Sequence, residues 1–236
     1  MKRMFLTALT MAVGVGASAH ADDVACEALR DYEAPPVGTV FTYEVRHRGE
    51  AIPVWILHTV SDVDGSLVEY THQFESSDGS RPPSTPRTQS ADAGMFPVTE
   101  GVTESGDPIR TRRYDQPVTE ILAGLEPGST AEFESSETSS MNNRTRTVTA
   151  PAQLIFNRCD MIEVDGTDEP VRVYDLVYTA RTYVAGRRPR ADMTAEKQNT
   201  IYLSDRYGYP LRIDSETGHV QVIRVELPGA DGTDDQ

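Results

Sequence analysis

Three histidines lie at alternating positions of consecutive β-like segments, where imidazoles could gather as metal ligands or general bases. They are His47, His58 and His72. The expected strand register separates His47 from the other two and makes His58 and His72 diagonal neighbours, roughly 7 to 8 Å apart. Zinc requires three or four ligands, and no third one is identifiable. The sequence therefore predicts no metal site, and half-buried histidines bonded to Tyr70 or to a backbone carbonyl explain the pattern better.

Motifs for catalysis or cofactor binding add no candidate. The nucleophile elbow, the zinc-protease motif, the phosphate-binding loop and the dinucleotide fingerprint do not occur in the sequence. With 37 acidic residues, no carboxylate pair stands out as a general acid and base. We therefore predict no catalytic residue and no cofactor, and favour a non-enzymatic protein, with a hydrolase of unrecognised type as the last alternative.

Arginine supplies almost all of the positive charge, and several arginines cluster in expected loops. Guanidinium groups bind phosphates, carboxylates and acidic partners through paired hydrogen bonds. The candidate anion-binding residues are Arg110, Arg112, Arg113, Arg187, Arg188 and Arg190. Pairing with nearby acids is the alternative, because the chain carries a formal net charge of -15.

The first 21 residues have the features of an export signal. Lys2 and Arg3 precede an apolar stretch over residues 4–15, and a small-x-small cleavage site ends at Ala21. We therefore predict cleavage after Ala21 and a periplasmic mature protein.

Cysteine usage agrees with an oxidising compartment. The two cysteines, Cys26 and Cys159, both follow the signal, and an even number in an exported protein predicts a disulfide. Closing so long a loop removes on the order of 5 kcal/mol of denatured-state entropy in the chain-entropy model.

The charge balance and hydropathy limit the partners. An acidic chain does not suit nucleic acid, whose phosphates require a basic face, or simple adsorption to an anionic bilayer. No later stretch approaches the roughly 18 apolar residues of a membrane span, so we predict no transmembrane anchor in the mature chain. We expect one β-rich domain over residues 22–228 and a disordered acidic tail over 229–236.

A period of two in hydrophobicity predicts three consecutive strands, at 40–47, 52–60 and 66–74. A two-residue turn at 48–49 places Tyr43 opposite Val54, and a three-residue turn at 63–65 places Ile56 opposite His72. Both turns keep the same apolar residues on one face. This agreement predicts an antiparallel meander.

The remaining chain continues the pattern with interruptions. Residues 75–97 are rich in Ser, Pro and Gly and are expected to form a long loop. Short helices are expected at about 24–30 and 117–124. Further strands are expected at 130–134, 145–150, 153–164, 170–184, 199–204, 209–214 and 219–227. The predicted fold is mainly β: a single curved antiparallel sheet, as a half-barrel or open barrel, with one or two short helices.

The segment around Tyr202, Gly208, Pro210 and Arg212 resembles the terminal hairpin of periplasmic half-barrel proteins of proteobacteria. The order of elements along the mature chain has the same resemblance. The lipoprotein-localisation carriers have this architecture, and their curved sheet shelters acyl chains. The resemblance implies an apolar ligand, a lipid or a lipidated envelope protein as partner.

The apolar face of the meander is the corresponding candidate site. Its residues line either a closed core or a groove for an apolar ligand. The candidate ligand-binding residues are Phe41, Tyr43, Val54, Ile56, His58, Tyr70, His72 and Phe74. An envelope scaffold with a filled core, acting through its loops and arginines, is the alternative.

Overall fold

The computed structural model describes residues 26, 29, 31–47, 54–80, 82–102, 108–141, 144–181, 194–216 and 218–229. This part of the chain forms twelve strands and one short helix. The elements are β1 (Val40–His47), β2 (Val54–Asp64), β3 (Leu67–Ser76), β4 (Arg87–Asp92), β5 (Phe96–Val102), β6 (Pro108–Tyr114), α1 (Val118–Ala123), β7 (Thr130–Met141), β8 (Arg144–Val164), β9 (Thr167–Arg181), β10 (Thr194–Ser204), β11 (Tyr209–Ser215) and β12 (Gly218–Glu226).

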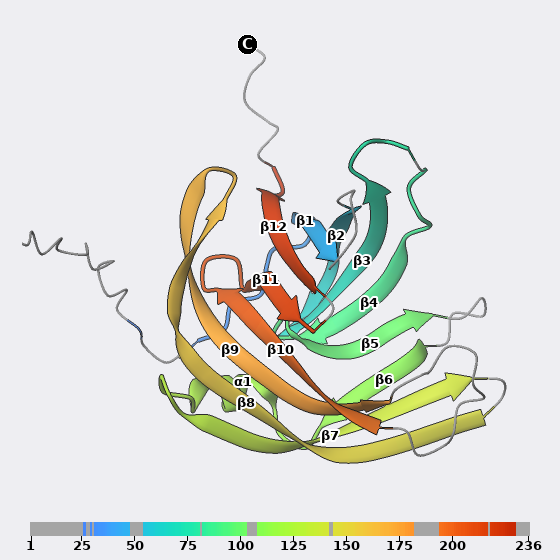
Figure 1. Ribbon diagram of the computed structural model, residues 1–236, viewed down its shortest axis with the longest axis vertical. Coiled ribbons are helices and arrows are strands. Elements are labelled where there is room, and N and C mark those ends of the chain that lie inside the picture. The colour runs from blue at the N-terminus through green and yellow to red at the C-terminus, as the bar shows by residue number, and fades with distance from the viewer. Residues whose placement is uncertain are drawn as a thin grey trace, which may run out of the picture.

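The strands form one antiparallel sheet that closes into a barrel. Each strand pairs with its neighbours in sequence, and β1 pairs with β12 to complete the circle (Figure 1). The mainly β, antiparallel prediction is confirmed, but the predicted half-barrel or open barrel is wrong. Closure pairs the sheet edges that an open barrel would leave exposed.

One strand of the barrel, β4, lies wholly within the segment that the sequence predicted to be a loop. Segment 75–97 contains the end of β3, all of β4 and the start of β5, and β6 follows before α1. The sequence of β4, RTQSAD, has no apolar alternation, although Ser90 and Ala91 are buried. Its place in the sheet is set by backbone pairing with β3 and β5. This pairing does not depend on a hydrophobic side-chain pattern.

The first two hairpins have a different register from the predicted one. Tyr43 pairs with Ile56, and Ile56 pairs with Phe74, so each partner is two residues away from the expected one. In the second hairpin, β2 continues to Asp64 and carries a bulge between Val60 and Asp62. A shift of two residues preserves which face a side chain occupies. The predicted apolar face therefore survives the error in register.

One end of the barrel, which we call the sealed end, is covered by the segment before β1 and by α1. The Tyr32 hydroxyl donates a hydrogen bond to the Gly208 carbonyl at 2.8 Å. A Cβ at Gly208 would overlap the Glu33 carbonyl, and Gly208 has a φ of +55°. This β10–β11 turn therefore needs glycine both for its conformation and for its close approach to the segment.

The predicted helix over 117–124 is confirmed as α1. Pro117 precedes it and Gly124 ends it, and its buried face consists of Val118, Ile121 and Leu122. In Figure 1, α1 lies at the left of the barrel, away from the right-hand ends of β5, β6 and β7. Of the other predicted helix, Cys26 and Leu29 lie in irregular structure, and the rest falls outside the described residues.

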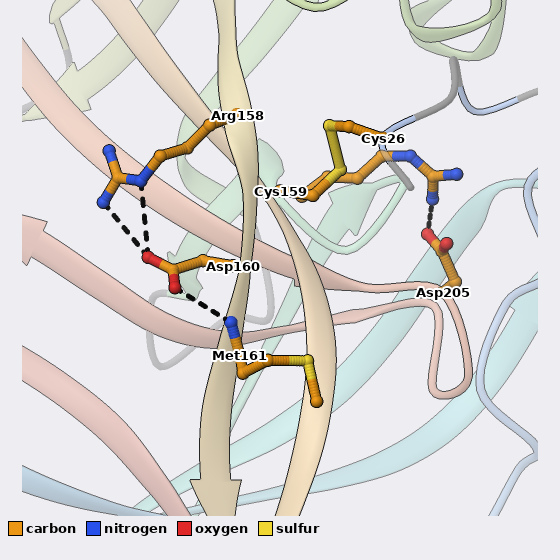
Figure 2. Close-up of a disulfide and its surroundings, with 7 residues drawn as sticks. Cys26, Arg158, Cys159, Asp160, Met161 and Asp205 are labelled. Atoms are coloured by element: carbon orange, nitrogen blue, oxygen red, sulfur yellow. Dashed lines mark hydrogen bonds and ion pairs between the residues drawn. A yellow bond between two sulfur atoms is a disulfide. The ribbon is translucent and has the colours of Figure 1, made fainter. Parts of the chain in front are cut away.

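The predicted disulfide joins the segment before β1 to β8. Cys26 and Cys159 are bonded, with their Cα atoms 5.4 Å apart and a sequence separation of 133 (Figure 2). Close to this bond, Arg158 pairs with Asp160 on the same strand. The disulfide holds the N-terminal segment against the barrel wall.

Two hydrophobic clusters fill the interior. The first, at the sealed end, includes Leu29, Phe96, Leu122, Phe133, Leu154, Phe156, Tyr174 and Leu203. The second includes Phe41, Tyr43, Val60, Val68, Ile162, Val171, Tyr209, Leu211 and Val222.

Three predictions lie outside the described residues: the signal peptide at 1–21, the arginines at 187, 188 and 190, and the tail beyond Gly229.

Candidate functional site

The predicted ligand-binding side chains occupy two depths inside the barrel. Phe41 and Tyr43 of β1 are buried, with 0% and 2% of their surface exposed. The other six lie on the inner face of β2 and β3 and keep accessible surface. This set, which we call the inner strip, consists of Val54, Ile56, His58, Tyr70, His72 and Phe74. Phe74 is 44% exposed and is the most accessible member.

Cross-strand pairing makes the inner strip continuous. Ile56 lies opposite Phe74, and His58 lies directly opposite His72 instead of diagonally as predicted. The His58 ring packs on Tyr70 with 4.5 Å between centroids, and the His72 ring meets the edge of Phe74 at 4.6 Å. The aromatic rings of the strip therefore form a continuous row of contacts. This row ends at Phe74, which lies towards the end of the barrel opposite the sealed end.

The two histidines belong to a hydrogen-bond chain that starts in the core. The Tyr209 hydroxyl lies 3.1 Å from Nδ1 of His58, and Nε2 of His58 lies 2.9 Å from Nδ1 of His72. Tyr209 of β11 is buried and stacks on Phe41 at 4.4 Å. Three of the four imidazole nitrogens are thereby engaged, and Nε2 of His72 is the fourth. The ring of the predicted bonding partner Tyr70 contacts the His58 ring at an interplanar angle of 32°, and the Tyr209 hydroxyl shares a hydrogen bond with His58.

The environment keeps the chain of groups uncharged at neutral pH. Burial lowers the pKa of His58 well below its usual value, and the neighbouring His72 lowers it further. Burial, together with the Arg87 guanidinium, lowers the pKa of His72. Burial raises the pKa of Tyr209 well above its usual value. Both imidazoles are therefore neutral, and the Tyr209 hydroxyl keeps its proton.

One cation stands beside the inner strip on β4. Arg87 pairs with His72 across the β3–β4 ladder, which places both residues on the same face of the sheet. The next inward pair on this ladder is Tyr70 and Gln89, joined by a hydrogen bond from the Tyr70 hydroxyl at 3.2 Å. Arg87 is exposed and forms no ion pair with another described residue.

The acids closest to this region in the strand ladders lie on the other face of the sheet. Glu44 pairs with Trp55, and Trp55 pairs with Glu75. These three residues alternate with the inner-strip positions, so they occupy the outer face. The inner strip therefore has a positive charge beside it and the nearest strand carboxylates behind it.

The predicted arginine cluster on β6 is divided between the two faces of the sheet. Arg112 is 8% exposed and pairs with Glu137 of β7 at 2.7 Å, and its guanidinium lies over the Tyr178 ring. Arg110 is half-buried on the same face, and Arg113 is exposed on the opposite one. Arg112 therefore fits the alternative to anion binding, which was pairing with a nearby acid.

Sequence reasoning missed two residues of this site. Tyr209 reaches His58 across the interior from a strand 151 positions away, so no local pattern indicates the contact. Arg87 belongs to the segment that was predicted to be a loop. Arg87 is recognised as part of this site only when β4 is known to pair with β3, because this pairing places Arg87 opposite His72.

Three solved structures are similar to this chain at low sequence identity. The hypothetical lipoprotein YmcC from Escherichia coli (K12) aligns with 78% of this chain and 83% of its own, at 11% identity and a TM-score of 0.44. A protein from Bacteroides fragilis NCTC 9343, classed as exported with a YmcC-like fold, aligns with 84% and 100%, at 9% identity and a TM-score of 0.45. A protein from Parabacteroides distasonis ATCC 8503, classed as a lipoprotein, aligns with 85% and 99%, at 10% identity and a TM-score of 0.46.

No protein-family model matches the sequence, and no curated protein matches it. None of the three solved structures is described as a lipoprotein-localisation carrier, so that resemblance rests on the sequence features alone. No helix in the described part of the chain has the length and apolar composition needed to cross a membrane.

Proposed function

We propose that this is an exported, periplasmic, non-enzymatic protein that binds an apolar ligand, or the acyl chain of a lipidated partner, on its inner strip. The export-signal pattern and the disulfide Cys26–Cys159 support the compartment. The observation that carries the binding function is the accessible surface of the strip, whose apolar part comprises Val54, Ile56 and Phe74.

The contrast with the rest of the interior supports this assignment. Phe41, Val60 and Val68 lie on the same inner face and are at most 1% exposed. If the strip served only as core, burying Phe74 in the same way would stabilise the fold through its large apolar surface. An aromatic side chain that stays accessible beside apolar neighbours is typical of a binding surface.

Binding of a neutral apolar fluorophore, N-phenyl-1-naphthylamine, tests the proposal. We expect a saturable increase in fluorescence with the unmodified protein and about tenfold weaker binding by Phe74→Ala, equivalent to about 1.4 kcal/mol. Native mass spectrometry of the purified protein should also detect a bound lipid that solvent extraction removes.

Met161→Ala is the matched control. Met161 is 43% exposed on β8 and lies next to Asp160, remote from the strip in the sheet order (Figure 2). Its variant should bind the fluorophore as the unmodified protein does. Absence of saturable binding, or equal losses in Phe74→Ala and Met161→Ala, would contradict the proposal.

A scaffold with a filled interior is the second candidate, favoured by the packing of the two hydrophobic clusters. The Phe41 and Tyr209 rings stack at 4.4 Å with an interplanar angle of 18°. The Phe156 and Tyr174 rings contact at 4.8 Å in the other cluster. A protein of this kind would bind no fluorophore on the strip and would act through its outer surface.

A further inference from the structure

We propose that the ligand of the inner strip is a single-chain amphiphile with a carboxylate head, bound with its head between Arg87 and Nε2 of His72 and its chain along Ile56 and Phe74. This inference rests on the proposed function and specifies the chemical class of its ligand. It follows from the charge and hydrogen-bond capacity that lie beside the apolar surface.

The charge argument concerns Arg87. In this chain acidic residues outnumber basic ones, 37 to 22. Arg87 is exposed, forms no ion pair with another described residue, and stands on the same face as Phe74 and His72. A guanidinium in this setting binds a carboxylate in a two-point hydrogen bond.

The hydrogen-bond argument concerns His72. Its Nδ1 is engaged by His58, and the imidazole of His58 is in turn held by Tyr209. When the Tyr209 hydroxyl donates to His58 and His58 donates to His72, the proton of His72 is on Nε2. This nitrogen then donates to an anion that approaches from the direction of Arg87. The chain of bonds also fixes the orientation of the ring in advance.

The apolar side chains beside His72 indicate the direction in which the acyl chain of the ligand runs. His72 and Phe74 are two residues apart on one strand, and their rings are in contact at 4.6 Å. Ile56 lies opposite Phe74 and continues the apolar surface towards Val54. An acyl chain whose head is at His72 therefore meets Phe74 and Ile56 next. Because one guanidinium and one neutral imidazole balance a single negative charge, a carboxylate fits better than a phosphate dianion.

Isothermal titration with four twelve-carbon probes tests this inference at pH 7 and low ionic strength. The probes are dodecanoate, dodecyl phosphate and dodecyltrimethylammonium, each below its micelle concentration, and dodecanol below its solubility limit. We expect dodecanoate to bind at least tenfold more tightly than dodecanol, and the cationic probe to bind most weakly. Arg87→Gln should reduce the preference for dodecanoate over dodecanol to about twofold or less.

The pH dependence provides a second readout. The groups that face His72 are His58 from β2, Tyr70 from its own strand and Arg87 from β4. A bound carboxylate offsets the effect of Arg87 and favours the imidazolium form, so binding takes up protons. The affinity for dodecanoate should rise several-fold between pH 7.5 and pH 5.5. In His72→Gln this rise should be lost.

Arg113→Gln is the matched control, because it removes an exposed arginine from the outer face of β6. It should keep the preference for dodecanoate. Equal binding of dodecanol and dodecanoate would overturn the head-group assignment and leave the proposed function intact. Tighter binding of dodecyl phosphate would overturn the choice of carboxylate. Failure of all four probes to bind would overturn both proposals.

Discussion

The sealed end and the inner strip are built from similar aromatic residues but differ in what covers them. At the sealed end, the segment before β1 bonds to Gly208 through Tyr32 and is held to β8 by a disulfide. At the other region, Phe74 ends a row of contacting rings and keeps almost half of its surface accessible. The first region is covered by bonded and packed chain, and the second keeps apolar surface accessible. Changes at the sealed end should therefore affect unfolding, and changes at the strip should affect binding.

Removal of the disulfide should have a large effect on stability. The double variant Cys26→Ser and Cys159→Ser opens a loop of 133 residues and should lower the free energy of unfolding by about 2 to 5 kcal/mol. Urea denaturation followed by circular dichroism measures this change. Binding of N-phenyl-1-naphthylamine under native conditions should stay within twofold. A large loss of affinity in the folded variant would show that the two regions are coupled.

Gly208→Ala should destabilise the protein through the close approach of two backbones. Its Cβ would overlap the Glu33 carbonyl, and the residue has a positive φ. Gly65 has a similar φ of +62° but no atom within 4 Å of an added Cβ, so Gly65→Ala is a matched control. We expect a loss of about 1 kcal/mol for Gly65→Ala and roughly 2 to 3 kcal/mol more for Gly208→Ala. If both variants lost the same free energy of unfolding in urea denaturation, the N-terminal segment would move away from the added Cβ at Gly208 without destabilising the protein.

The features of the fold that the sequence predicted correctly are those marked by residues close together in sequence or by the cysteine count. Alternation placed Phe41, Tyr43 and Ile56 on one face, and this assignment survived a register error because the error was two residues. Pro117 and Gly124 marked the ends of α1 correctly. The cysteine pair was predictable because an exported protein with two cysteines has only one intramolecular pairing.

The unpredicted part depends on contacts between distant segments. Closure of the barrel involves β4, whose polar sequence has no strand-like period. The bond from Tyr209 to His58 crosses the interior, and the pairing of Arg87 with His72 exists only because β4 joins β3. Sequence patterns thus located the strip, but they did not show how its histidines are held or which charge lies beside them.

The histidine pair should make stability fall at mildly acidic pH. Both imidazoles have a lowered pKa in the folded protein, so the unfolded chain binds more protons below its histidine pKa of about 6.5. Stability should be full above this pH and should decline as the pH falls from about 6.5 towards the lowered values, by up to about 1.4 kcal/mol per pH unit for each histidine.

Urea midpoints measured from pH 7.5 to pH 5 test this dependence. His72→Gln should show a shallower decline than the unmodified protein because one of the two groups is removed. Met161→Ala, which removes no titratable group, should keep the original slope. An unchanged slope in His72→Gln would indicate that His72 does not contribute to the decline.

Phe74→Ala should have the smallest effect on stability, in contrast to its effect on binding. The ring is 44% exposed, and its edge contact with His72 is worth about 0.5 to 1.5 kcal/mol in typical cases. We expect a loss of about 1 kcal/mol or less, whereas Phe41→Ala, at a fully buried position, should lose about 3 to 5 kcal/mol. Urea denaturation of the two variants gives the difference directly. If Phe74→Ala proved as costly as Phe41→Ala, Phe74 would belong to the core, and the inner strip would lose the accessible apolar surface on which ligand binding depends.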